Sequence, residues 1–125
     1  MLMPYLAARL KSIYHAIDGV RAMLRTQHNA KIHAIATIMV AIACVGFEIS
    51  KPEAALLVLA ITIVWLAEAL NTAFEFICDV VSPQQNPQVK LAKDIAAGGV
   101  LLASIGAAIV GILVFLPHIL SSQAQ

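Results

Sequence analysis

Residues 54–79 read AALLVLAITIVWLAEALNTAFEFICD. Residues 54–67 contain no charged side chain, and the rest of the stretch keeps a helical composition with polar residues set into it. A helix needs about 20 predominantly apolar residues to cross a bilayer. The stretch therefore predicts a transmembrane helix over residues 53–82, with a polar face in its second half.

Two further segments, residues 31–50 and residues 91–116, are also apolar enough to span a bilayer. Across the 125-residue chain, 61% of residues are hydrophobic and 12% are charged, against about 45–50% and about 25% in soluble domains. The composition excludes a soluble domain, and the length supports one domain over residues 1–125. A net charge of +1 does not suggest a nucleic-acid binder. We expect an all-α membrane protein with three transmembrane helices.

Residues 4–27 differ in kind from these spans. Basic side chains at positions 9, 11, 21 and 25 alternate with apolar residues that recur at spacings of three and four. Such a pattern is typical of an amphipathic helix that lies in the membrane interface. It is not a secretory signal, because charges interrupt the apolar residues throughout.

The lysines and arginines predict the orientation, since those near the ends of spans stay on the cytoplasmic side. Basic residues precede the first span and lie between the second and third, whereas only Lys51 lies between the first and second. We therefore expect the N-terminus and the second connector in the cytoplasm. The connector near residues 50–53 and the tail over residues 117–125 are expected to face outward.

The predicted second span carries Glu68, Asn71, Glu75 and Asp79. At 100° per residue, offsets of three, seven and eleven return to within about 60° of Glu68, so all four share one face. If the helix begins near Pro52, Glu68 lies about 24 Å along it and Glu75 about 35 Å. Glu68 is then inside the cytoplasmic half of the hydrocarbon, and Glu75 and Asp79 emerge at its edge.

An intramembrane carboxylate costs several kcal/mol unless it faces a protein interior or water, so it indicates a functional site. The alternative is an interhelical hydrogen bond or ion pair that only holds the bundle together. Carboxylate oxygens bind Mg²⁺ together with substrate phosphates, and Lys and Arg balance phosphate charge. A deeper carboxylate can accept a proton from a hydroxyl. Phosphoryl transfer to a membrane-embedded alcohol needs all of these groups, although the chain has no glycine-rich phosphate loop.

Two motifs make the sequence recognisable: EALNTAFE at residues 68–75 followed by Asp79, and KLAKDIAAG at residues 90–98. Together they resemble the signature of the prokaryotic diacylglycerol kinase family, which includes the undecaprenol kinases. The likeness extends from about residue 11 to residue 116. It implies a homotrimeric integral membrane kinase of the bacterial inner membrane, with an interfacial helix and three transmembrane helices per subunit. It also implies ATP as co-substrate, Mg²⁺ as cofactor and a membrane lipid alcohol as acceptor.

The resemblance also implies roles for individual residues. Glu68 would be the general base at the lipid hydroxyl, and Asn71 would shape the same catalytic site. Glu75 would bind the metal and, through it, the nucleotide. The remaining nucleotide-binding residues that the resemblance implies are Asp79, Lys93 and Asp94, and, on the interfacial helix, Lys11, Tyr14, His15 and Gly19.

One departure from the family pattern lies just before the first span. The family usually has a Glu there as a second metal ligand, two residues ahead of an Asn, whereas this chain reads Gln27-His28-Asn29. Gln27 keeps an oxygen that can bind Mg²⁺ but lacks the charge. The expectation is a weaker metal site, the loss of a second metal, or recruitment of His28.

The acceptor and the class of function each leave an alternative. Asn71-Thr72-Ala73, Ser82-Pro83 and residues 94–98 look closer to the undecaprenol kinases than to the diacylglycerol kinases of enteric bacteria, so undecaprenol is slightly favoured over diacylglycerol. The alternative to a kinase is a non-catalytic or ion-conducting small membrane subunit. An ion pathway predicts polar residues throughout the membrane depth, whereas here they lie at one edge.

Overall fold

The computed structural model describes residues 2–82, 84 and 86–122, with side chains from residue 6 onward. Four helices make up these ranges: α1 (Leu2–Thr26), α2 (His28–Gly46), α3 (Lys51–Val81) and α4 (Pro87–Ser122). No strand occurs in the part of the chain that is described. The last three helices are long and apolar enough to cross a membrane. The predicted all-α fold with three spans is confirmed, while Pro83 lies outside the described residues.

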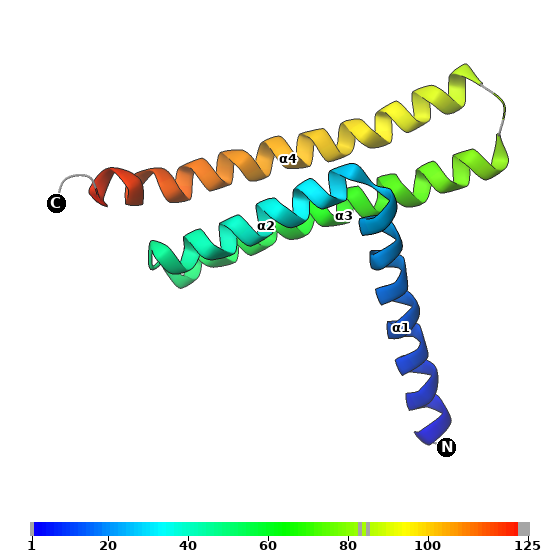
Figure 1. The fold of residues 1–125 in the computed structure, drawn as a ribbon, viewed down its shortest axis with the longest axis horizontal. Helices are drawn as coiled ribbons and strands as arrows, with labels where there is room; N and C mark the ends of the chain where they lie inside the picture. Colours follow the sequence, from blue (N-terminus) through cyan, green and yellow to red (C-terminus); the bar gives the residue numbers. More distant parts are fainter. Residues whose placement is uncertain (1, 83, 85, 123–125) are drawn as a thin grey trace.

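The arrangement is an antiparallel hairpin with two additions (Figure 1). α3 and α4 pack against each other, α2 lies against α3, and α1 runs across the direction of the other three helices. Among the described residues, no backbone contact joins α2 to α4. α1 thus has the placement expected of a helix in the membrane interface.

The three candidate spans differ in length, and α2, the shortest of them, indicates where the membrane boundary lies. α2 has 19 residues, α3 has 31 and α4 has 36. At 1.5 Å per residue these lengths correspond to about 28, 46 and 54 Å, against a hydrocarbon thickness of about 30 Å. α2 is just long enough to span, so the end of the α3–α4 hairpin extends past the level at which α1 meets α2 (Figure 1).

The turn between α2 and α3 is tight and capped. Glu48 has a φ of 50°, and the Ile49 N–H reaches back to the Cys44 carbonyl at 3.1 Å, which closes the end of α2. α3 then begins after Ser50, whose N–H donates to the Glu53 carboxylate at 3.0 Å, with Pro52 in the first turn.

α4 extends beyond residues 91–116 at both ends, so residues 117–122 of the expected outward-facing tail are helical. The helix continues through Pro117 to Ser122. Proline removes one backbone hydrogen bond, but the turn that follows is held to α3 by other contacts. After the proline, His118 Nε2 lies 3.2 Å from Glu53 Oε1 of α3. Just before it, Phe115 meets Phe47 of the α2–α3 turn, with ring centroids 6.1 Å apart. Residues 123–125 of the predicted tail lie outside the described residues.

The buried core of a single chain is small and partly polar. Buried apolar side chains are few, and three polar residues of α3 are buried with them: Glu68, Asn71 and Thr72. Long apolar side chains are exposed along all four helices, including Leu10 on α1 and Ile42 on α2. Lipid or further copies of the chain must cover these surfaces, as in a membrane protein.

Candidate active site

The polar face predicted on α3 exists, and its exposure changes along the helix. Glu68 is 1% exposed and Asn71 is 6% exposed, whereas Glu75 is half-buried and Asp79 is exposed. The burial comes from α2, whose first turn packs over Glu68 with Ala30 at 0% exposure. The face therefore runs from a dry interior at Glu68 to water at Asp79.

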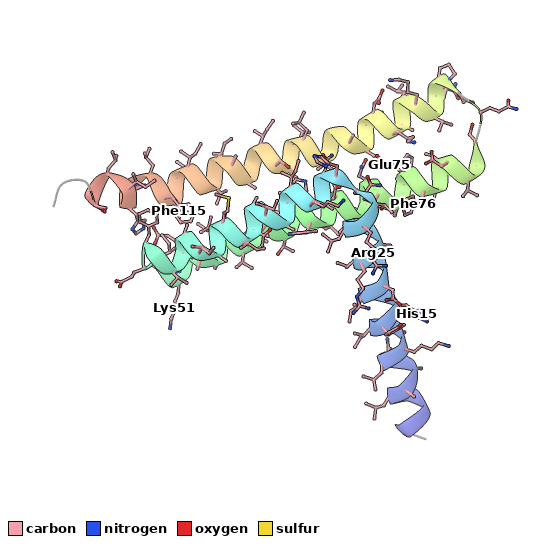
Figure 2. All side chains as sticks on the ribbon, viewed as in Figure 1. His15, Arg25, Lys51, Glu75, Phe76 and Phe115 are labelled. Carbon is pink, nitrogen blue, oxygen red and sulfur yellow. The ribbon has the colours of Figure 1, made fainter. Side chains whose placement is uncertain are left out.

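Glu75 lies where α1 meets α2 (Figure 2), and both of its carboxylate oxygens accept hydrogen bonds from amides. Asn71 Nδ2 donates to Oε1 at 3.1 Å, and Gln27 Nε2 donates to Oε2 at 3.2 Å. Gln27 is the N-cap residue of α2, with extended backbone angles. Gln27, the residue that departs from the family pattern, thus contacts Glu75 directly, so an amide faces the carboxylate there.

Glu68 lies two turns deeper, about 10 Å along α3 from Glu75. Its carboxylate interacts with the backbone N–H of Ala30, in the first turn of α2. Glu68 Oε2 is buried and has no hydrogen-bond partner in the described structure. A buried acceptor without a partner is costly, which indicates that a ligand group completes it.

The imidazole of His33 on α2 faces that orphaned oxygen. Its Nε2 lies 3.9 Å from Glu68 Oε2, beyond hydrogen-bond distance, and it too is buried without a partner. The sequence analysis did not single out His33. The signal that could have singled it out is a cluster of three polar or aromatic residues, His33, Thr37 and Trp65, in otherwise aliphatic spans.

Beyond Glu75, one ion pair joins α3 to α4 and a second lies within α4. Lys93 Nζ binds Asp79 Oδ1 at 2.8 Å, and Lys90 Nζ binds Asp94 Oδ2 at 2.6 Å. A hollow of about 570 Å³ opens here between the two helix ends and is lined by Asp79, Lys90 and Lys93. The structure brings Asp79 and Lys93, two of the expected nucleotide-binding residues, together. It places Asp94 on an exposed face beside Lys90 rather than in the hollow.

The nucleotide-binding residues predicted on α1 lie apart from this cluster within one chain. Lys11, Tyr14, His15 and Gly19 are all exposed. His15 projects from the middle of α1, well away from Glu75 (Figure 2). Gly19 leaves open space where a Cβ would stand. A single described chain therefore does not bring the α1 residues to the carboxylates of α3.

Comparisons of the sequence with known proteins identify its family. The model of the family described as prokaryotic diacylglycerol kinase matches residues 14–115. An undecaprenol kinase of Bacillus subtilis is 37% identical over 109 residues, which cover 87% of this chain and 89% of that protein. A diacylglycerol kinase of Synechocystis sp. is 39% identical over 113 residues, which cover 90% of this chain and 65% of that protein.

Membership of a kinase family implies ATP as the co-substrate and a lipid as the acceptor. The match spans the interfacial helix from Tyr14 onward and all three candidate membrane spans. The chain belongs to the prokaryotic diacylglycerol kinase family and is a membrane lipid kinase.

Proposed function

We propose that this protein transfers the γ-phosphate of ATP to the primary hydroxyl of a membrane lipid alcohol, with Glu68 as the general base. The observation that carries the proposal is the buried Glu68 carboxylate, whose Oε2 has no partner in the described structure. A base must lie within hydrogen-bond reach of the proton that it takes, and this oxygen is available to a hydroxyl.

The reaction balances with the groups at hand. The acceptor oxygen attacks the γ-phosphorus, its proton passes to Glu68 Oε2, and the bond from the γ-phosphorus to the bridging oxygen of ADP breaks. ADP leaves toward water and the lipid phosphate remains in the membrane. Most of the catalysis in such transfers comes from positioning and charge neutralisation. Asn71 contributes to positioning by holding Glu75 at 3.1 Å.

The donor set around Glu75 suits Mg²⁺. Glu75, the buried and unpartnered Asn71 Oδ1, and the amide of Gln27 offer hard oxygen ligands if the two amides present their oxygens. The described residues contain no group of three His, Cys, Asp or Glu side chains that could hold a metal. When bound, Mg²⁺ would supply positive charge that offsets the charge of the phosphates. Glu75, Gln27 and Asn71 would hold it only together with waters and the nucleotide phosphates.

The nucleotide would lie on the water side of Glu75. The hollow between α3 and α4 carries Lys93 and Lys90, whose charges suit phosphates. Asp79 and Asp94 would each release a lysine to the nucleotide, since both are paired in the structure. Lys11, Tyr14, His15 and Gly19 of α1 complete the proposed nucleotide site in the assembled enzyme, which we propose is a homotrimer. The apolar side chains exposed on all three candidate spans are available for contacts between subunits in such an assembly.

The proposed orientation puts the N-terminus, α1 and the α3–α4 connector in the cytoplasm of a bacterial cell, with the protein in the inner membrane. Basic residues gather at this end of the bundle, and ATP is a cytoplasmic substrate. Undecaprenol is the acceptor that we favour over diacylglycerol, because the NTA and DIAAG motifs are closer to the undecaprenol kinases and the relative of that name covers most of both chains.

The test is transfer of labelled γ-phosphate from MgATP to diacylglycerol and to undecaprenol, presented side by side in mixed micelles with purified protein. Label in one lipid, lost in Glu68→Gln, is the expected result and names the acceptor. Label that persists in the Glu68→Gln protein would overturn the base assignment. Failure of folded protein to label either lipid would overturn the proposed reaction.

A further inference from the structure

Thr72 is a buried polar residue of α3 that has no role in the proposed reaction so far. Its side chain is 5% exposed, and its hydroxyl oxygen Oγ1 is buried without a hydrogen-bond partner in the described structure. A buried hydroxyl without a partner is costly, because it loses its hydrogen bonds to water and gains none in return. This hydroxyl therefore indicates that a bound ligand completes it.

The other three threonines of the chain show what a threonine in a helix ordinarily does. Each donates its hydroxyl to the carbonyl four residues earlier: Thr26 to Ala22 at 2.9 Å, Thr37 to His33 at 2.7 Å and Thr62 to Val58 at 2.8 Å. Thr72 makes no such bond to the carbonyl of Glu68. Its hydroxyl is available to a ligand, whereas the other three are occupied by the backbone.

Thr72 lies between the two glutamates on which the proposed reaction depends. It follows Glu68 by four residues and precedes Glu75 by three, which places it about 6 Å and about 4.5 Å from them along the helix axis. At 100° per residue, the three side chains fall within about 60° of one another. Thr72 therefore shares their face of α3 and occupies the interval between them.

The phosphoryl group must pass through the same interval. In the proposed reaction the attacking oxygen lies at the Glu68 carboxylate, and the nucleotide lies on the water side of Glu75. The attacking and leaving oxygens of such a transfer are roughly in line, and charge spreads over the three equatorial oxygens of the phosphoryl group between them. These equatorial oxygens therefore come to the level of Thr72 on α3.

The chemistry of this face makes Thr72 the donor suited to those oxygens. The ionised carboxylates of Glu68 and Glu75 can only accept hydrogen bonds, and they repel the charge of the phosphoryl group. The amide Nδ2 of Asn71 already donates to Glu75 at 3.1 Å. A hydroxyl can donate without adding a charge, and a donor held in a buried site stabilises developing charge more strongly than water does.

We infer that the Thr72 hydroxyl donates a hydrogen bond to an equatorial oxygen of the γ-phosphoryl group during its transfer, which makes Thr72 a further catalytic residue. The inference rests on the proposed function, since Glu68 and Glu75 define where the phosphoryl group lies. Thr72 keeps its own proton throughout. The proton of the acceptor passes to Glu68, and the phosphoryl group passes from the bridging oxygen of ADP to the acceptor oxygen.

Three substitutions test the contact by steady-state phosphoryl transfer. Thr72→Val keeps the branched shape but removes the hydroxyl, and should lower kcat about tenfold to hundredfold, as expected for a hydrogen bond to a charged group. Thr72→Ser keeps the hydroxyl and should recover most of the rate. Thr62→Val removes an exposed hydroxyl that is bonded to the backbone of the same helix, and should leave kcat unchanged. A change confined to the KM for the lipid in Thr72→Val would overturn the inference.

Thermal unfolding separates this role from a structural one. Because Oγ1 has no partner, Thr72→Val removes a buried polar atom without breaking a hydrogen bond, so the melting temperature in detergent should not fall. A fall in melting temperature that parallels the loss of kcat, with both recovered in Thr72→Ser, would assign the hydroxyl to packing and overturn the inference.

A binding measurement probes the phosphoryl contact without turnover. The full-length protein, in micelles that contain the lipid alcohol and Mg²⁺, is titrated with ADP alone and with ADP plus aluminium fluoride, a mimic of the transferring phosphoryl group. Thr72→Val should bind ADP as the wild type does and the aluminium fluoride complex at least about tenfold more weakly. An equal loss for both, or no loss for either, would overturn the inference. A loss that high Mg²⁺ reverses would assign the hydroxyl to the metal and would also overturn it.

The wild-type protein distinguishes failure of this inference from failure of the proposed function. If the wild type labels a lipid and Thr72→Val labels it equally fast, the role of Thr72 is removed and the proposed reaction remains. If the folded wild type labels neither diacylglycerol nor undecaprenol, both are removed.

Discussion

Each end of the bundle contains one glutamate of α3 opposite a histidine, and the two pairs differ. At the end near the α2–α3 turn, Glu53 Oε1 is 3.2 Å from His118 Nε2, and Glu53 also accepts from the Ser50 N–H. At the other end, Glu68 Oε2 and His33 Nε2 are 3.9 Å apart and both are buried without partners. A pair that is hydrogen-bonded and partly exposed joins helices. A pair that is buried and left open is suited to a ligand.

The largest expected effect separates the two glutamates. Glu68→Gln should lower phosphoryl transfer by about 10²- to 10⁴-fold, because a general base contributes that much. Glu53→Gln should leave turnover within about twofold of the wild type, since Glu53 lies in the first turn of α3, about 22 Å along the helix from Glu68. The check is steady-state transfer of labelled phosphate by both variants. Comparable losses of turnover in Glu68→Gln and Glu53→Gln would show that the two glutamates do not differ in function.

Glu75→Gln should have the next largest effect, and it should depend on magnesium. Glu75 is the only carboxylate among the proposed metal ligands, so its loss removes the main charge that attracts Mg²⁺. The concentration of Mg²⁺ needed for half-maximal activity should rise by tenfold or more, with part of the turnover recovered at high Mg²⁺. A magnesium titration at saturating ATP measures this. An unchanged requirement would remove Glu75 from the metal site.

Gln27→Glu should strengthen the metal site, which is the opposite of the effect expected of Glu75→Gln. The substitution would place two carboxylates near the present 3.2 Å contact, where like charges repel unless a cation lies between them. Activity should stay intact or increase, and Mg²⁺ should stabilise the variant against thermal unfolding more than it stabilises the wild type. Melting curves with and without Mg²⁺ test this. Abolished activity would show that the role assigned to Gln27 is wrong.

The smallest effect is expected at the opposite end. His118→Leu breaks the contact with Glu53 and disturbs the ring contact with Phe47. The pair is partly exposed, so the melting temperature in detergent should fall by less than about 5 °C. The kcat should not change. A loss of turnover in a His118→Leu protein that is folded and retains its oligomeric state would contradict this account, because it would show that the Glu53–His118 pair affects catalysis.

Much of the fold followed from the sequence because apolar length and helical spacing are local properties. The long uncharged runs located α2, α3 and α4, and the 3.6-residue period put Glu68, Asn71 and Glu75 on one face. The extent of α4 did not follow, because Pro117 is a local stop signal that contacts with α3 override. Only the folded chain contains the partner that holds the helix together there.

The site was predictable only in part, for the same physical reason. Lys93 and Asp79 lie far apart in the sequence, yet their motifs indicated a shared role and the structure pairs them at 2.8 Å. The contact between Gln27 and Glu75 depends on how α1 and α2 meet over α3, which no periodicity encodes. His33 escaped notice as a site residue because its meaning lies in a distance of 3.9 Å to Glu68 and in the absence of any other partner for either atom within the described structure.

The most direct measurement is the rate of a single turnover by Glu68→Gln, with MgATP bound in advance and lipid alcohol added at saturation, followed by quenching on the millisecond scale. The expected result is a phosphoryl-transfer step slowed at least about hundredfold, with nucleotide affinity retained. A transfer step as fast as that of the wild-type protein would contradict the assignment of Glu68 as the base.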